Sequence, residues 1–230
     1  MEPEKIAAEN ACSLLTAPKN TAGAESPLRG KTLVFLGSSV TCGSAANGVS
    51  FADIIGRKHG CEIVKAAVSG TTLADTGPDS YVRRLREIKT EAADVFICQL
   101  STNDAGRGTP LGALSQKADG TGLDLSTVAG ALEYVALYAE KRWGCPVAFY
   151  TSPRYPSEAY GKMAALLEAL RQKRGFTVID LWNNGALNAA TQQYRERYMA
   201  DAIHPTQAGY EELWAPVFEE ALIKIITGER

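Results

Sequence analysis

The chain has 230 residues, 45% of them apolar and 22% charged, and its formal charge at pH 7 is −2. This length suits one α/β domain with a sizeable core. The slightly acidic balance leaves no basic surface for nucleic acid, and no apolar run approaches the ~20 residues of a membrane span, so we expect neither kind of partner.

Residues 1–30 are predicted to be an N-terminal arm, and residues 31–230 to be the folded domain. The arm has a short helical pattern and then a loop rich in proline, glycine, asparagine and serine. Its first residues are acidic and amphipathic, without the basic and then apolar layout of a signal peptide. We therefore expect the protein in the cytoplasm. No feature of the sequence sets its oligomeric state.

Five apolar segments of the domain are predicted to be strands, and helical patterns separate them. The strands are expected at residues 31–36, 61–68, 94–100, 146–151 and 176–181. The helices are expected at residues 47–60, 79–89, 126–143, 157–175 and 186–199, and from a cap at Thr206 to about 226. This alternation predicts a parallel, doubly wound sheet whose strand-to-helix turns meet at one edge. Residues 106–125 have no apolar period, which predicts a long loop and a possible lid.

The first strand runs into a turn that carries three hydroxyls, Ser38, Ser39 and Thr41. Residues 33–36 are continuously apolar, as expected for a strand that is buried on both faces. The carboxyl ends of such strands are where open α/β sheets bind ligands. Two more turns, with Gly70 after the second strand and Asn103 after the third, should lie at the same edge. Each alone would be an ordinary turn residue.

The chain has two histidines, and their surroundings differ. His59 ends a charged helical segment, where a solvated side chain or a helix C-terminal cation is expected. His204 lies three residues after Asp201, just before the last helix, so this carboxylate could hold one ring nitrogen and leave the other free for a proton. Because a serine hydroxyl needs such a base, Ser39, His204 and Asp201 form a candidate triad. The oxyanion donors would be the backbone N–H groups of Ser39 and Gly70 and the side-chain amide of Asn103.

The five cysteines are single, and an odd number without a C-x-x-C pair argues against both a disulfide framework and a zinc site. Cys42 follows Ser39 by three residues, and a buried filler is favoured there over a thiol nucleophile. Neither H-E-x-x-H nor a strand-borne G-x-G-x-x-G occurs, so we expect no metal and no cofactor. Thr41 also stands where the G-x-S-x-G elbow of other serine hydrolases needs glycine.

Taken together, these residues resemble the SGNH hydrolases, also called the GDSL esterase/lipase superfamily. The resemblance rests on four blocks, which are FLGSSVTCG with Ser39, AVSGTT with Gly70, STND with Asn103, and DAIHPT with Asp201 and His204. It implies a flavodoxin-like three-layer α/β/α sandwich with a five-stranded parallel sheet, and the triad and oxyanion donors above. The chain departs from the family at Ser38, where aspartate is usual, and at residues 65–70, KAAVSG, where N-x-G-x-S-G is usual. The Gly-Ser-Ser-Val-Thr block resembles a bacterial subgroup.

The expected function is therefore hydrolysis of a small-molecule ester by a serine esterase. A short acyl group such as acetyl is expected, because residues 106–125 carry little apolar bulk, and the resemblance suggests carbohydrate esters. A thioesterase, lysophospholipase or acyltransferase with the same triad is the alternative. The non-enzymatic alternative is a protein that binds phosphate or flavin, since a turn of glycine and hydroxyl residues can also bind phosphate. That alternative gives no role to Asn103, Asp201 or His204.

Overall fold

The computed structural model of the chain describes residues 11–12 and 26–229. One sheet has the strand order β1-β3-β2-β4-β5-β6. Its parallel strands are β2 (Thr32–Gly37), β3 (Glu62–Val68), β4 (Val95–Gln99), β5 (Val147–Tyr150) and β6 (Thr177–Ile179). The predicted α/β fold with a five-stranded parallel sheet is confirmed, and each strand lies within the range expected for it to within one residue.

The short strand β1 (Ala11–Cys12) pairs antiparallel with the carboxyl end of β3. It lies in the predicted arm, where a helical pattern was expected instead. The rest of the arm up to residue 25 lies outside the described residues, so the boundary at residue 30 stays a prediction. Residues 26–30 approach the domain, because Leu28 is fully buried in one of its cores.

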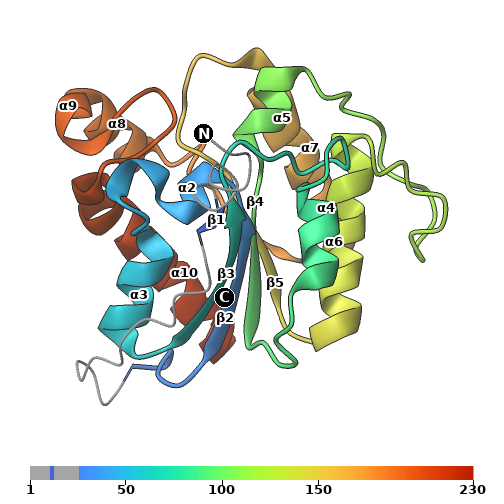
Figure 1. Cartoon of the computed structure of the whole chain (residues 1–230), viewed down its shortest axis with the longest axis horizontal. Coiled ribbons are helices and arrows are strands. Elements are labelled where there is room, and N and C mark those ends of the chain that lie inside the picture. Colours follow the sequence, from blue (N-terminus) through green and yellow to red (C-terminus); the bar gives the residue numbers. More distant parts are fainter. Residues whose placement is uncertain (1–10, 13–25, 230) are drawn as a thin grey trace, which may run out of the picture.

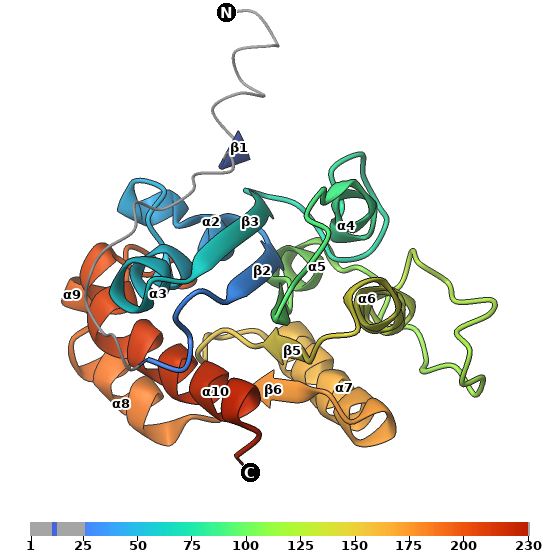
Figure 2. The same ribbon diagram turned by 90° about the horizontal axis from the view of Figure 1, so that it is seen from below.

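Helices cover both faces of the sheet (Figures 1 and 2). One face carries α4 (Tyr81–Glu87), α6 (Val128–Trp143) and α7 (Glu158–Arg174), and the other carries α3 (Phe51–His59) and α10 (Ala215–Thr227). The remaining helices are α2 (Ser39–Cys42), α5 (Thr102–Arg107), α8 (Gly185–Gln193), α9 (Arg195–Tyr198), a 3₁₀ turn at Ser44–Ala46 and a π-helical segment at Gly209–Trp214. The result is a three-layer sandwich.

The sheet divides the apolar side chains between two cores. Along β2, Leu33 and Phe35 enter the core under α3 and α10, whereas Val34 and Leu36 enter the core under α4, α6 and α7. Successive side chains of a strand point to opposite faces, so a strand covered on both sides needs a continuous apolar run. The prediction that this strand is buried on both faces is confirmed.

Two predicted helices differ from those observed. The segment expected as one helix over 186–199 is broken at Tyr194, whose φ of −122° lies outside the helical region and separates α8 from α9. The last helix begins as expected with a cap from Thr206, whose hydroxyl accepts the N–H of Gly209 at 3.1 Å. The segment Gly209–Trp214 of this helix is π-helical rather than α-helical. Gly209 packs closely on the end of α9, because a Cβ built on it would lie only 2.2 Å from the carbonyl oxygen of Tyr198, and a side chain therefore does not fit there.

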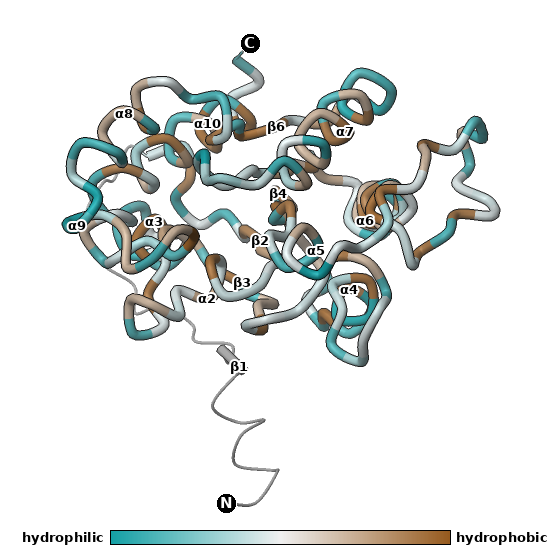
Figure 3. The backbone as a smooth tube through the Cα atoms, turned by 90° about the horizontal axis from the view of Figure 1, so that it is seen from above, coloured by the Kyte–Doolittle hydropathy of each residue, from teal (hydrophilic) through white to brown (hydrophobic). Residues whose placement is uncertain are grey.

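The predicted lid loop does not cover the serine turn. Its first two residues belong to α5, and the segment beyond projects beside α6, away from α2 (Figures 2 and 3). The fully buried carboxylate of Glu133 in α6 accepts the N–H of Ser115 at 2.7 Å and contacts Lys173 of α7, and Arg174 donates to the carbonyl of Ala118. The loop is therefore fixed to α6 and α7.

Candidate active site

The carboxyl ends of β2, β3 and β4 lie side by side, and α2, α5 and the turn after β3 surround them (Figure 3). The chain passes from β2 into α2 within two residues. A Cβ at Gly37 would lie 1.7 Å from Thr41 Oγ1, so only glycine fits this turn. Ser39 begins α2, and its N–H is therefore one of those without a partner inside the helix. The predicted turn is thus a short helix with Ser39 at its start.

The structure brings Ser39, His204 and Asp201 together. In the sequence, His204 lies 165 positions after Ser39 and Asp201 lies 162 positions after it. Ser39 Oγ lies 2.8 Å from His204 Nε2, and His204 Nδ1 lies 2.7 Å from Asp201 Oδ2. The other carboxylate oxygen, Oδ1, accepts the backbone N–H groups of Ile203 at 2.7 Å and His204 at 2.8 Å. The loop after α9 is therefore folded around the Asp201 side chain, which places the imidazole over Ser39.

The charges of this group suit proton transfer. Burial works to raise the pKa of Asp201, but the backbone N–H groups of His204 and Ile203 and the imidazole outweigh it, and the pKa is lowered. The carboxylate is then ionised at neutral pH and accepts Nδ1–H of His204. In that tautomer Nε2 carries a lone pair, which can accept a hydrogen bond from the Ser39 hydroxyl.

Gly70 and Asn103 lie at the same edge. Gly70 has a φ of +77°, and nothing lies within 4 Å of a Cβ built on it, so this backbone borders open space. It lines a cavity of about 380 Å³ together with the turns around it and Arg107. Asn103 Nδ2 donates to the carbonyl of Thr71 at 3.0 Å and to Ser38 Oγ at 3.2 Å. The amide therefore faces the hydroxyl next to Ser39.

Ser38 is braced by a residue that sequence reasoning missed. Gln99 Oε1 accepts the Ser38 N–H at 2.9 Å and the Thr41 hydroxyl at 2.8 Å, and Thr41 in turn lies 2.6 Å from the hydroxyl of Tyr150. These side chains are fully or almost fully buried. The signal was a glutamine directly after the apolar run of residues 95–98, near the end of the predicted strand.

Lys65, one of the departures from the family pattern, supports the other end of α2. Its buried ammonium donates to the carbonyls of Cys42 at 3.2 Å and Gly48 at 3.0 Å, and to Asp53 Oδ2 at 2.6 Å. Asp53 also accepts the N–H of Ser50, the residue that caps the start of α3. A lysine inside an apolar strand pattern was the signal for this pair, and sequence reasoning did not use it.

His59 differs from its predicted environment. It is the last residue of α3 as expected, but it is 9% exposed, so the prediction of a solvated side chain is wrong. Nδ1 lies 2.7 Å from Ser26 Oγ, and Nε2 lies 3.5 Å from Glu219 Oε1. The chain before β2 and helix α10 cover this imidazole, which explains its burial.

Two buried residues near the site have structural surroundings, and the burial expected for Cys42 is confirmed. Cys42 is buried within α2. Asp104 is structural, because its carboxylate accepts the backbone N–H groups of Leu73 at 2.6 Å and Ala74 at 3.2 Å. Burial raises the pKa of Asp104 although these donors oppose the shift.

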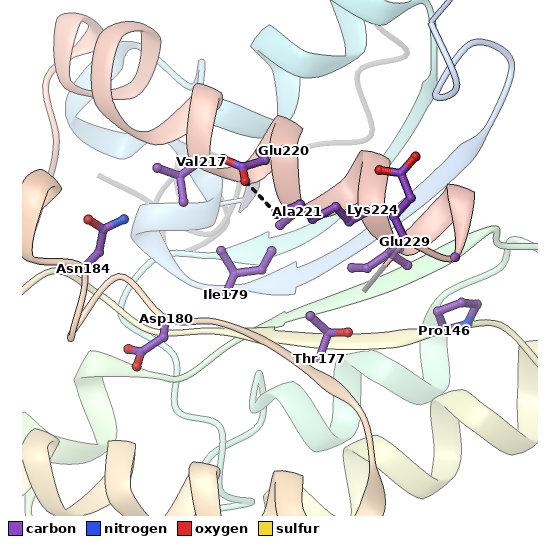
Figure 4. A pocket seen from close by; sticks show the side chains of 12 residues that line it. Pro146, Thr177, Ile179, Asp180, Asn184, Val217, Glu220, Ala221, Lys224 and Glu229 are labelled. Atoms are coloured by element: carbon purple, nitrogen blue, oxygen red, sulfur yellow. Dashed lines mark hydrogen bonds and ion pairs between the residues drawn. The ribbon is translucent and has the colours of Figure 1, made fainter.

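A second hollow, of about 510 Å³, lies between β6 and α10 (Figure 4). Ile179, Val217 and Ala221 line it, and Glu220 forms an ion pair with Lys224 at its rim. None of the predicted site residues borders it. Across residues 11–12 and 26–229, no three His, Cys, Asp or Glu side chains are grouped as a metal site, and no helix is long and apolar enough to cross a membrane.

Residues 35–212 match the GDSL-like lipase/acylhydrolase family, and all five candidate site residues fall in that range. The chain belongs to this family. It is therefore an enzyme, an esterase or lipase of the GDSL type, and an ester is its substrate. A comparison with curated protein sequences finds no match.

Solved structures share the fold. One with 26% identity covers 86% of this chain and 98% of its own, with a TM-score of 0.70. An acetyl xylan esterase is 15% identical, with 83% and 99% coverage and a TM-score of 0.59. A family two carbohydrate esterase from Clostridium thermocellum, solved with cellohexaose, is 16% identical, with 95% and 68% coverage and a TM-score of 0.57.

Proposed function

We propose that this GDSL-type enzyme is a serine ester hydrolase in which Ser39 is the nucleophile, His204 the base and Asp201 the residue that orients the imidazole. The observation that carries the proposal is the unbroken series of short contacts from Ser39 Oγ through His204 to Asp201. As Oγ attacks the ester carbonyl carbon, Nε2 takes its proton. The imidazolium then protonates the leaving alcohol, and a water molecule activated by the same nitrogen releases the acid.

The negative charge on the former carbonyl oxygen needs donors that are already in place. Ser39 N–H, Gly70 N–H and Asn103 Nδ2 are assigned this role, and each such donor lowers a barrier of this kind by ~3 kcal/mol. Asn103 would exchange its longer contact, to Ser38 Oγ, for the oxyanion and keep its bond to the carbonyl of Thr71. Ser38 then retains Gln99 as its partner.

Asn103→Ala is accordingly expected to lower kcat by about a hundredfold or more, with KM little changed, because the lost donor acts mainly in the transition state. Steady-state kinetics with p-nitrophenyl acetate measure both constants. Asn183→Ala, at an exposed position in the loop after β6, is the matched control and should behave as the wild type. A change confined to KM would make Asn103 a substrate-binding residue instead.

The substrate we propose is a short acyl ester, most simply acetyl, of a polar and carbohydrate-like alcohol. The cavity beside Gly70 supports it, since the side chains at its border are mostly small or polar, including Ser69, Thr72, Ser80 and Arg107. Two of the structures with this fold are described as an acetyl xylan esterase and a carbohydrate esterase with bound cellohexaose. We also assign the Gly-Ser-Ser-Val-Thr block to a bacterial subgroup of the family.

A panel of p-nitrophenyl esters from acetate to octanoate, followed by acetylated xylo- and cello-oligosaccharides, tests this substrate class. Activity should fall steeply beyond short chains, and acetate should be released from the sugars. A preference for octanoyl or lysophospholipid substrates would contradict it in favour of a lipase. Faster transfer to an added alcohol than to water would indicate an acyltransferase, and a preference for acyl thioesters a thioesterase.

A further inference from the structure

The guanidinium of Arg84 lies next to the candidate oxyanion donors and has no role in the steps above. Arg84 belongs to α4, where the neighbouring Arg83 and Arg86 are exposed. Arg84 itself is only 8% exposed. The helix thus turns one of its three arginines inward, against the ends of β2 and β3.

The guanidinium donates hydrogen bonds to four uncharged oxygens, which lie in β2, in β3, just after β3 and just before α4. Nη2 donates to the carbonyl of Gly37 at 2.8 Å and to Thr71 Oγ1 at 3.0 Å, Nη1 donates to the carbonyl of Ala66, and Nε donates to the carbonyl of Asp79 at 2.9 Å. The planar fork therefore connects separate pieces of backbone in a fixed geometry.

Two of the acceptors, Gly37 and Thr71, lie beside the candidate oxyanion donors. Gly37 ends β2, two residues before Ser39. Thr71 directly follows Gly70, and its hydroxyl donates to the carbonyl of the last residue of β3 at 2.7 Å. The Thr71 carbonyl accepts the amide of Asn103 at 3.0 Å. One side chain thus reaches the segments of all three donors, two directly and the third through Thr71.

Burying a cation costs free energy, so the position of Arg84 needs a compensating gain. Burial lowers the pKa of the guanidinium, but an arginine side chain stays protonated in proteins. An inward lysine would have no planar fork and could not hold the same acceptors in one plane. The gain that the contacts show is the alignment of the β2 and β3 ends.

We propose that Arg84 is a positioning residue that holds the N–H groups of Ser39 and Gly70 and the amide of Asn103 in register for the oxyanion. The inference rests on the proposed function of Ser39. Because a misplacement of about 1 Å in such a site can cost about a hundredfold in rate, its loss should act on kcat. KM should change little, since the donors act in the transition state.

The test compares Arg84→Gln, Arg84→Lys and the exposed-neighbour control Arg86→Gln in p-nitrophenyl acetate hydrolysis, with thermal unfolding measured for each. We expect kcat to fall by about a hundredfold in Arg84→Gln, to recover in part in Arg84→Lys, and to stay unchanged in Arg86→Gln. Arg84 lines a hollow of about 530 Å³ beside β3, so millimolar guanidinium should be able to enter there and restore part of kcat to Arg84→Ala. A purely structural role predicts neither rescue.

Thr71→Val keeps the test decisive if the Arg84 variants do not fold, because it removes only the hydroxyl that Arg84 holds. It too should lower kcat with KM little changed. A wild-type kcat in Arg84→Gln or in Thr71→Val would overturn the inference. So would a loss of activity that matches the fraction of unfolded protein and that neither lysine nor guanidinium restores. Ser39→Ala is assayed in parallel. If it is inactive while Arg84→Gln is fully active, only this inference fails, whereas an active Ser39→Ala would overturn the proposed function and this inference together.

Discussion

Ser39→Ala is expected to abolish ester hydrolysis while the protein stays folded. Removal of the nucleophile of a serine triad lowers kcat on the order of a millionfold, because no other side chain is in place to accept the acyl group. The side chain is small and 7% exposed, and its hydroxyl contacts His204 rather than the cores, so the substitution leaves the packing intact. Hydrolysis of p-nitrophenyl acetate, with circular dichroism as the check on folding, measures both effects.

Ser44→Ala is the matched control for this prediction. Ser44 lies five residues further along, in the 3₁₀ turn after α2, and is exposed. Its loss should leave kcat at the wild-type value. Full activity in Ser39→Ala would show that another group attacks the ester, and the proposed mechanism would then be wrong.

His204→Ala should have the second-largest effect, close to that of Ser39→Ala, because a serine hydroxyl without a base is a weak nucleophile. Effects within such a unit are not additive, so the double variant with Ser39→Ala should be no slower than either single one. The same assay measures all three variants. The loss should appear in kcat, since the imidazole moves the proton in the chemical step.

His59→Ala is the natural control, as His59 is the other histidine of the chain. It contacts Ser26 and lies near Glu219. His59 is the last residue of α3, whereas the first residue of that helix is the one nearer to α2 in the chain. We expect its loss to lower thermal stability and to leave kcat nearly unchanged. An inactive His59→Ala with an active His204→Ala would reverse the assignment of the base.

The sequence predicted the sheet and the residues at its edge because both depend on short local patterns. An apolar run followed by glycine and hydroxyls marks a buried strand and its turn, and parallel strands bring their carboxyl ends together. Ser39 and His204 could therefore be paired although they are far apart in the chain. The helices α2 and α5 were predicted only as turns, because four and six residues are too few to show a helical period.

The supporting residues could not be predicted, because their partners come from other elements. Arg84 has the sequence context of a charged, solvent-facing helix position, and only the packing of α4 against β2 and β3 turns it inward. Gln99 and Lys65 interrupt apolar strands, which marks them as unusual but does not reveal which turn they hold. His59 was expected in solvent because the residues that cover it come from the chain before β2 and from α10.

The central claim is that Ser39 is a nucleophile that His204 activates. The most direct measurement is reaction with a fluorophosphonate, followed by mass spectrometry of the labelled peptide in the wild type and in His204→Ala. The proposal predicts one label, on Ser39, and a strongly reduced labelling rate without His204. A label on Cys42 or another residue, or equal labelling of both proteins, would contradict it.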